Sequence, residues 1–336
     1  GACHPDATYN NHLQEPFSFQ FTTSDRGSIS IVQTYPSAGE SNVPLNPTFI
    51  AVFDAKVVNK TVSSNVAVLD MDGNVIKVNT RTAKYNQAPA PYGHAAFEIG
   101  SDGLKPNTDY QFVLYPEISD VDGVLLNETV SIPFRTGDEV EPTLPLLDEM
   151  ETAFFVVDKE TSVDASGMSV LADKNKKYAG SYSNKMAYTF TNVGGEAIFN
   201  AINPALIVGN SVSKLGMYVA ADYSFNTLYA KWATDGDIKY TKICDLDYAG
   251  WLYQEADMSE LPAGVDYQFM GLRLVGGSNL LSGSGAFNID NIHAEYVQPG
   301  TETGVEDVTI ESADRKVIEN GYLYILLNGV RYNVQG

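Results

Sequence analysis

Short stretches in which apolar and polar residues alternate recur along most of the chain. In the first half, the clearest of them are residues 29–32, 48–53, 65–70, 75–78 and 110–114. A period of two is typical of β-strands with one buried face, whereas a helix buries every third or fourth residue. Turn residues such as Asp72-Gly73-Asn74 separate these stretches. About seven strands between residues 28 and 138 predict an immunoglobulin-like β-sandwich.

A second β-rich region follows residues 139–145, which are acidic, contain two prolines and are typical of a semi-stiff linker. Its expected strands include residues 185–190, 214–219, 227–232, 269–274 and 286–290. The size of this region and its number of strands favour a jelly roll, in which two sheets pack as a Greek-key sandwich. We therefore predict an all-β protein in which the two sandwiches have independent hydrophobic cores.

The end of the chain has a β pattern of its own. Residues 316–334 contain two Asn-Gly turns, which predict a meander of three short strands. A sheet this small is marginally stable alone, so it is expected to dock on a neighbour or to serve as a signal. The expected parts are an N-terminal segment with one strand (1–27), the Ig-like domain (28–138), the linker (139–145), the jelly roll (146–298) and the C-terminal tail (305–336).

Charge and length limit the partners of the chain. Its 336 residues include 42 Asp and Glu against 21 Lys and Arg, a formal net charge of −21. Such a surface repels phosphate groups, so we expect no nucleic-acid partner. No stretch reaches the roughly 18–20 apolar residues of a membrane-spanning helix. Membrane contact would therefore need a covalent lipid anchor.

The sequence lacks the motifs of common catalytic and metal sites. It has no H-E-x-x-H pair, no G-x-S-x-G elbow and no Walker loop. Residues 245–256 begin like an EF-hand loop, but Ala256 stands where the acidic twelfth ligand belongs, so we reject that site. We expect no enzymatic activity. The many carboxylates leave a glycosidase pair open as an alternative.

Several landmarks of the first domain resemble one family. Residues 35–46, 104–110, 119–123 and 134–137 resemble the bacterial Ig-like domains of the Big_5 type. This resemblance extends from end to end of the domain. It implies a spacer or adhesion module of secreted proteins, without catalysis.

The second domain resembles the β-jelly-roll, carbohydrate-binding modules found beside carbohydrate-active enzymes. The resemblance rests on residues 148–151, 178–183, 250–251, 261–262 and 287–292. Many such modules bind a structural calcium between an opening Glu and a closing Asp. The resemblance therefore implies a calcium site with Glu149 or Glu151, Asp290 and backbone oxygens, the hard ligands that calcium prefers. The alternative is that these acids cap turns and bind no ion.

Sugar binding requires flat aromatic faces beside polar groups that can hydrogen-bond hydroxyls. The second domain contains eleven of the 20 tyrosines and both tryptophans. Trp232, Tyr223 and Tyr229 lie near Asp222 and Asn226 in the sequence and form the predicted ligand-binding platform. Aromatic residues also dominate β cores. The alternative is therefore that Trp232 faces the core together with Ala230 and Leu228, which lie at every second position before it and share its face.

Both ends of the chain resemble export signals. Cys3 resembles the lipidated cysteine of bacterial lipoproteins, which would tether the protein by acyl chains, and the alternative is a free thiol. Residues 328–336 resemble the C-terminal sorting tails of secreted Bacteroidetes proteins. These resemblances imply an exported protein, at the outer-membrane surface or extracellular.

The leading hypothesis is a non-catalytic cell-surface protein that binds a polysaccharide or cell-surface glycan, or adheres, through the jelly roll, with the Ig-like domain as spacer. Two alternatives remain open. One is an accessory part of a glycoside-processing hydrolase that uses a carboxylate pair. The other is a purely structural stalk.

Overall fold

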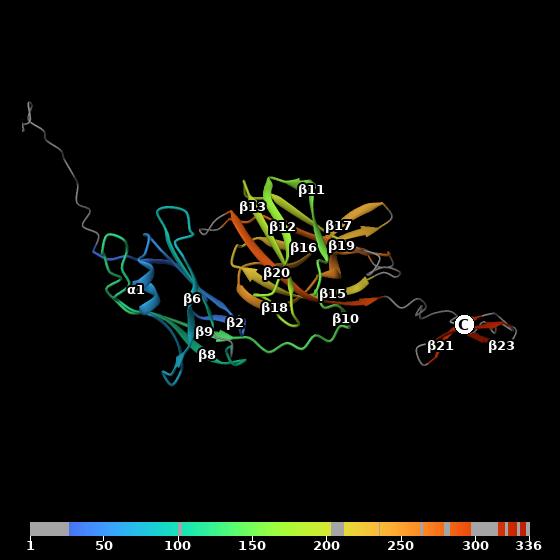
Figure 1. Cartoon of the computed structure of the whole chain (residues 1–336), viewed down its shortest axis with the longest axis horizontal. Coiled ribbons are helices and arrows are strands. Elements are labelled where there is room, and N and C mark those ends of the chain that lie inside the picture. The colour runs from blue at the N-terminus through green and yellow to red at the C-terminus, as the bar shows by residue number, and fades with distance from the viewer. Residues whose placement is uncertain are drawn as a thin grey trace, which may run out of the picture. The chain divides into compact units, whose positions relative to one another are not determined.

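The computed structural model describes residues 27–99, 103–202, 212–234, 236–262, 265–278 and 283–296, and the backbone of three strands between residues 315 and 333. The chain forms two compact units, Gly1–Val297 and Gln298–Gly336 (Figure 1). Almost every regular element is a strand, so the predicted all-β class is confirmed. No described helix is long and apolar enough to cross a bilayer.

The first sandwich contains two sheets, as the alternating pattern predicts. One sheet has the order β1 (Ile31–Tyr35), β3 (Thr48–Phe53), β7 (Gly93–Ile99), β6 (Val78–Tyr85). The other has the order β2 (Glu40–Val43), β9 (Val130–Thr136), β8 (Asp109–Leu114), β4 (Val66–Asp70), β5 (Val75–Ile76). A short helix, α1 (Asn59–Ser64), precedes β4. Only β2 and β9 pair in parallel among the described strands of this sandwich.

The second sandwich also has two sheets. The sheet that we call the β20 sheet has the order β12 (Ala165–Asp173), β13 (Ser183–Phe190), β20 (Ser284–Tyr296), β15 (Val212–Asp222), β18 (Ala249–Glu255), and β10 (Leu146–Asp148) also pairs with β20. The β16 sheet has the order β11 (Phe155–Val163), β14 (Glu196–Ala201), β19 (Gln268–Val275), β16 (Thr227–Thr234), β17 (Asp237–Asp245). A 3-10 turn, Met258–Glu260, follows β18.

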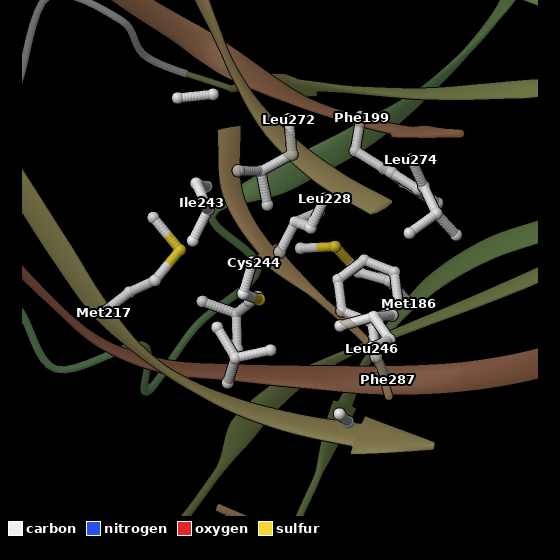
Figure 2. Close-up of a cluster of buried hydrophobic side chains, with 14 of the residues drawn as sticks. Met186, Phe199, Met217, Leu228, Ile243, Cys244, Leu246, Leu272, Leu274 and Phe287 are labelled. Atoms are coloured by element: carbon white, nitrogen blue, oxygen red, sulfur yellow. The ribbon is translucent and has the colours of Figure 1, made fainter. Parts of the chain in front are cut away.

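The space between these two sheets is filled by apolar side chains. Met186 and Phe287 from the β20 sheet meet Phe199, Leu228 and Leu272 from the β16 sheet (Figure 2). Along β16 the burial alternates strictly from Thr227 to Trp232, so every second side chain points away from this core. The outer faces of the two sheets therefore carry the polar and aromatic side chains that a ligand could reach.

The two cores are not independent, contrary to our prediction. Phe49 and Phe53 pack in the core of the first sandwich, whereas Ile50 and Val52, from the same strand, join the hydrophobic cluster of the second. Tyr35 and Ala96 join that second cluster as well. The reason is that residues 49–53 form a continuous apolar run, which buries both faces of β3.

The C-terminal unit contains a three-stranded antiparallel meander, as the two Asn-Gly turns predict. Its strands are β21 (Arg315–Glu319), β22 (Tyr322–Leu327) and β23 (Val330–Asn333). Cys3 and the strand expected near the N-terminus lie outside the described residues.

Candidate functional site

Trp232 is the largest side chain of the predicted platform, and its position corrects that prediction. Its side chain is 0% exposed, and its indole Nε1 donates a hydrogen bond to Thr241 Oγ1 at 2.9 Å. Its ring packs edge-to-face on Phe269, with 5.6 Å between the ring centroids. Because Trp232 shares its face of β16 with the buried Leu228 and Ala230, it belongs to the core and cannot stack on a sugar.

Three other residues of the predicted platform also bond inward. The Tyr223 hydroxyl donates to the Thr34 carbonyl oxygen at 3.1 Å. Asp222 Oδ2 accepts from the Tyr188 hydroxyl at 2.7 Å, and Asn226 Oδ1 accepts from the Gly277 amide at 2.8 Å. These contacts stabilise the turn after β15. Of the five predicted residues, only Tyr229 stands on an outer face.

Tyr229 belongs to a cluster on the outer face of the β16 sheet that sequence reasoning missed. We call it the Arg273 cluster, formed by Glu196, Tyr229, Tyr240 and Arg273. The guanidinium carbon lies 4.6 Å from the Tyr240 ring centroid and 5.7 Å from that of Tyr229. Arg273 Nε donates to Glu196 Oε2 at 3.0 Å, and Nη2 donates to Oε1. This two-point bond fixes the plane of the guanidinium.

The electrostatics keep the Tyr240 hydroxyl protonated. Burial raises the pKa of Tyr240, Arg273 acts to lower it, and the carboxylates Glu196 and Asp158 raise it further. A protonated phenol can both donate and accept a hydrogen bond.

A chain of hydrogen bonds extends the same face. Lys231 Nζ donates to Asn200 Oδ1 at 2.9 Å, and Asn200 Nδ2 donates to Asp158 Oδ2 at 2.9 Å. Burial acts to raise the pKa of Asp158, but hydrogen bonds from Thr161 and Asn200 outweigh it and lower the pKa, so this carboxylate stays ionised.

Gly271 lies beneath this chain of hydrogen bonds. Lys231 and Asn200 both pair with Gly271, so the lysine reaches across a position without a side chain. A Cβ there would collide with the Phe199 carbonyl oxygen, and φ is +138°. The glycine is therefore required for the close approach of β14 and β19.

This outer face offers what a polyhydroxylated ligand requires. Its donors are a guanidinium, an ammonium and two phenols, and its acceptors are two carboxylates and an amide oxygen. The residues of the Arg273 cluster, together with the hydrogen-bonded Lys231, Asn200 and Asp158, come from strands β11, β14, β19, β16 and β17, which hold them in fixed positions.

The structure places two of the three predicted calcium ligands at one loop. Asp290 Oδ2 accepts from the amides of Tyr178 and Ala179 at 2.7 and 3.2 Å. Glu151 Oε1 accepts from the Ser181 amide at 2.6 Å, whereas Glu149 is exposed. In the described part of the chain, no three His, Cys, Asp or Glu side chains are grouped to hold a metal ion.

Electrostatic interaction links these two carboxyls. Burial raises the pKa of Asp290, three backbone amides lower it, and the nearby charge of Glu151 raises it again. In this structure the two side chains anchor residues 178–181 through backbone amides. Calcium binding stays a prediction.

The described residues also form an acidic pocket of about 280 Å³, lined by β2 of the first sandwich and by β17, β18 and the turn between them in the second. Asp245 is held by the Lys242 ammonium at 2.5 Å and the Thr227 hydroxyl at 2.8 Å. Burial raises the pKa of Asp247, and the charge of Asp245 adds to that effect. The pocket is lined by Glu40, Ser41, Asn42, Cys244, Asp245, Asp247, Tyr248, Leu252 and Gln254.

A comparison with protein families finds a match over the first sandwich. Residues 25–136 match the bacterial Ig-like domain family, Big_5, which confirms the resemblance seen in the sequence. No curated protein matches the chain.

The solved structures that match the chain include carbohydrate-binding modules. One, from the β-sandwich superfamily, has 11% identity and a TM-score of 0.32 and covers 81% of this chain and 100% of its own. The CBM22-1 xylan-binding domain of Paenibacillus barcinonensis Xyn10C has 14% identity and a TM-score of 0.28, with coverage of 47% and 100%. TM-scores this low carry no conclusion about this chain.

Proposed function

We propose that the second sandwich is a non-catalytic glycan-binding module that binds a polysaccharide on the outer face of the β16 sheet. The Arg273 cluster carries this proposal. Its guanidinium plane and two tyrosine rings provide flat surfaces, and Lys231, Asn200 and Asp158 provide hydrogen-bonding groups beside them. Sites for small polar ligands combine aromatic or apolar surfaces, here the two tyrosine rings, with a few fixed polar groups.

The charges on this face also favour a neutral ligand. Arg273 is paired with Glu196, and Lys231 shares its hydrogen-bond chain with the ionised Asp158. A ligand therefore meets matched donors and acceptors rather than a field of one sign. Neutral sugar hydroxyls, which both donate and accept, fit this arrangement.

The remaining parts complete the proposal. The Ig-like domain serves as a spacer of an exported, surface-attached protein, anchored through a lipidated Cys3 or sorted by its C-terminal tail. The sequence resemblances at the two ends support this localisation. A structural calcium at Glu151 and Asp290 would raise the unfolding temperature on addition of Ca²⁺, and Asp290→Asn would abolish that shift.

The test is binding to a panel of soluble xylan, mannan, mixed-linkage glucan and pectin by affinity electrophoresis. Tyr240→Ala removes one flat ring and should weaken binding by about tenfold or more, a loss of at least about 1.4 kcal/mol. Val193→Ala is the control, because Val193 is an exposed apolar residue of the same sandwich, in the turn between β13 and β14 and outside the strands of the proposed site. A folded wild type that binds none of these polymers, or a Tyr240→Ala variant that binds normally, contradicts the proposal.

The hydrolase alternative has its best support in the acidic pocket. A carboxyl with a raised pKa beside a second carboxylate is the arrangement that general acid catalysis requires, and Asp247 beside Asp245 provides it. Release of reducing ends from the same polymers, lost in Asp247→Asn, would support this alternative.

A further inference from the structure

We propose that the same sandwich has a second saccharide site on the outer face of the β20 sheet, which makes the module bivalent. We call it the Tyr178 corner, formed by Tyr178, Tyr218, Trp251, Tyr253 and His293. The nature of its ligand rests on the proposed function, whereas its existence rests on the separate observations that follow.

An exposed aromatic ring is held rigidly at this corner. Tyr178 stacks on Tyr218 with 3.5 Å between the ring centroids and an interplanar angle of 15°. Trp251 stands beside Tyr178 at 6.1 Å and 65°, so the two rings form two walls of a corner. Tyr178 remains 43% exposed although one of its faces is covered. Its other face is therefore open to a ligand.

The loop that carries Tyr178 is fixed by buried polar groups. Asp290, which is fully buried, accepts hydrogen bonds from the amides of Tyr178 and Ala179. The Lys176 carbonyl oxygen accepts from Ser183 Oγ at 2.5 Å and from Asn288 Nδ2 at 3.1 Å. Burying a carboxylate is unfavourable. The buried Asp290 carboxylate nevertheless holds the backbone of an exposed tyrosine in place, which indicates a role for the Tyr178 ring beyond packing.

Two buried polar atoms at the base of the corner lack a partner. His293 is 7% exposed, and its Nδ1 bonds to the Leu144 carbonyl oxygen at 2.9 Å. A carbonyl only accepts, so Nδ1 carries a proton and donates, and Nε2, the other ring nitrogen, is buried without a hydrogen-bond partner. The Tyr253 hydroxyl, which lies over Gly216, also has no partner at hydrogen-bond distance, and burial and the nearby Glu255 carboxylate raise its pKa.

These features together fit a pyranose ring. The apolar face of a sugar packs on an open aromatic ring, and a hydroxyl or a bridging water supplies the missing partners at His293 and Tyr253. The linker forms one wall, because the Tyr218 hydroxyl donates to the Val140 carbonyl oxygen at 2.9 Å. A flat, exposed tyrosine backed by another aromatic ring suits the apolar face of a saccharide.

The corner is separate from the Arg273 cluster. The two sites lie on the outer faces of opposite sheets, and packed sheets are about 10 Å apart. A short oligosaccharide therefore cannot occupy both at once. Two glycan chains bound to one module would be cross-linked, and a long polymer would bind with increased avidity.

Calorimetric titration of the full chain with xylohexaose, cellohexaose and mannohexaose tests this inference. We compare wild type with Tyr178→Ala, Tyr240→Ala and the double variant. Tyr182→Ala is the control, because Tyr182 is exposed in the same loop. Near-UV circular dichroism checks that each variant is folded. We expect about two sites in wild type and Tyr182→Ala, about one in each single variant and none in the double variant.

The other outcomes separate the two proposals. One site that Tyr240→Ala abolishes and Tyr178→Ala leaves intact would overturn the second site and leave the proposed function standing. One site that only Tyr178→Ala abolishes would support the corner and overturn binding at the β16 sheet. Absence of binding of all three hexasaccharides would overturn both.

Discussion

The two tryptophans of the second sandwich illustrate how strand alternation decides the role of a side chain. Trp232 shares its face with Leu228, which is buried, and fills the core. Trp251 lies on β18 at a half-exposed position and contacts Tyr178 on the outer face. Both are aromatic residues in a β-rich region, so composition cannot distinguish them. The parity of each position relative to its apolar neighbours could have done so.

Trp232→Phe should lower stability without affecting ligand binding. The change removes the buried hydrogen bond to Thr241 and leaves its hydroxyl unpaired, at a cost of about 1–3 kcal/mol. Urea denaturation would measure this loss in the free energy of unfolding. The polysaccharide affinity of the folded variant should stay within about twofold of wild type. A selective loss of binding would place Trp232 in the site and contradict its assignment to the core.

His94 makes the stability of the chain depend on pH. It is 5% exposed, and burial, with a smaller effect from Lys84, lowers its pKa to about 4. The unfolded chain binds a proton near pH 6.5, and the folded chain does so only near pH 4. The neutral form of His94 therefore contributes its full share to the free energy of unfolding above about pH 6.5. As the pH falls from about 6.5 to about 4, the free energy of unfolding decreases by up to about 1.4 kcal/mol per pH unit.

His94→Gln tests that dependence. Because Gln does not titrate, the free energy of unfolding of this variant should fall less than that of wild type between about pH 7 and pH 4.5. Urea denaturation at several pH values would measure both slopes. Equal slopes in the two proteins would show that His94 protonates as easily when folded as when unfolded.

At the scale of the elements, alternation located the strands but not their neighbours. The predicted strand at residues 227–232 lies within β16, and that at 269–274 lies within β19. Their pairing could not be predicted, because a strand pattern shows which face is buried and not which strand lies alongside. Arg273 and Glu196 are 77 residues apart and meet only through the pairing of β14 with β19. The Arg273 cluster was missed for this reason.

Gly271→Ala should disrupt the pairing of β14 with β19. The added Cβ would collide with the Phe199 carbonyl oxygen at a positive φ, so we expect a loss of about 2–4 kcal/mol in the free energy of unfolding. Gly27→Ala is the matched control, because its Cβ would meet no atom within 4 Å. Similar thermal stability of the two variants would be inconsistent with this close approach.

At the scale of the whole molecule, the shared cluster couples the two sandwiches. The rings of Tyr35 and Tyr223 lie 4.9 Å apart, and Ile50 and Val52 pack in the same cluster as Tyr223. The continuous apolar run at residues 49–53 was visible in the sequence. We nevertheless predicted a strand with only one buried face there, whereas both faces of β3 are buried. Our predicted domain boundaries give the order of the two sandwiches along the chain, but they do not predict that the sandwiches pack against each other through a shared hydrophobic cluster.

Heat unfolding of Gly1–Val297 should therefore be one main cooperative transition in calorimetry. Val52→Thr places a hydroxyl in the shared cluster, which costs about 1–3 kcal/mol, and should broaden or split that transition. Val32→Thr is the control, since Val32 is exposed on the neighbouring strand β1. Two well-separated transitions in the wild type would show that the sandwiches unfold independently.

The most direct test of glycan binding at the β16 sheet is a crystal structure of the chain with a bound oligosaccharide of the best polymer from the affinity panel. We predict sugar density across the outer face of that sheet, with a ring over Tyr240 or Arg273 and hydroxyls bonded to Lys231 and Asp158. Density confined to the pocket around Asp247, with the Arg273 cluster bare, would contradict the account.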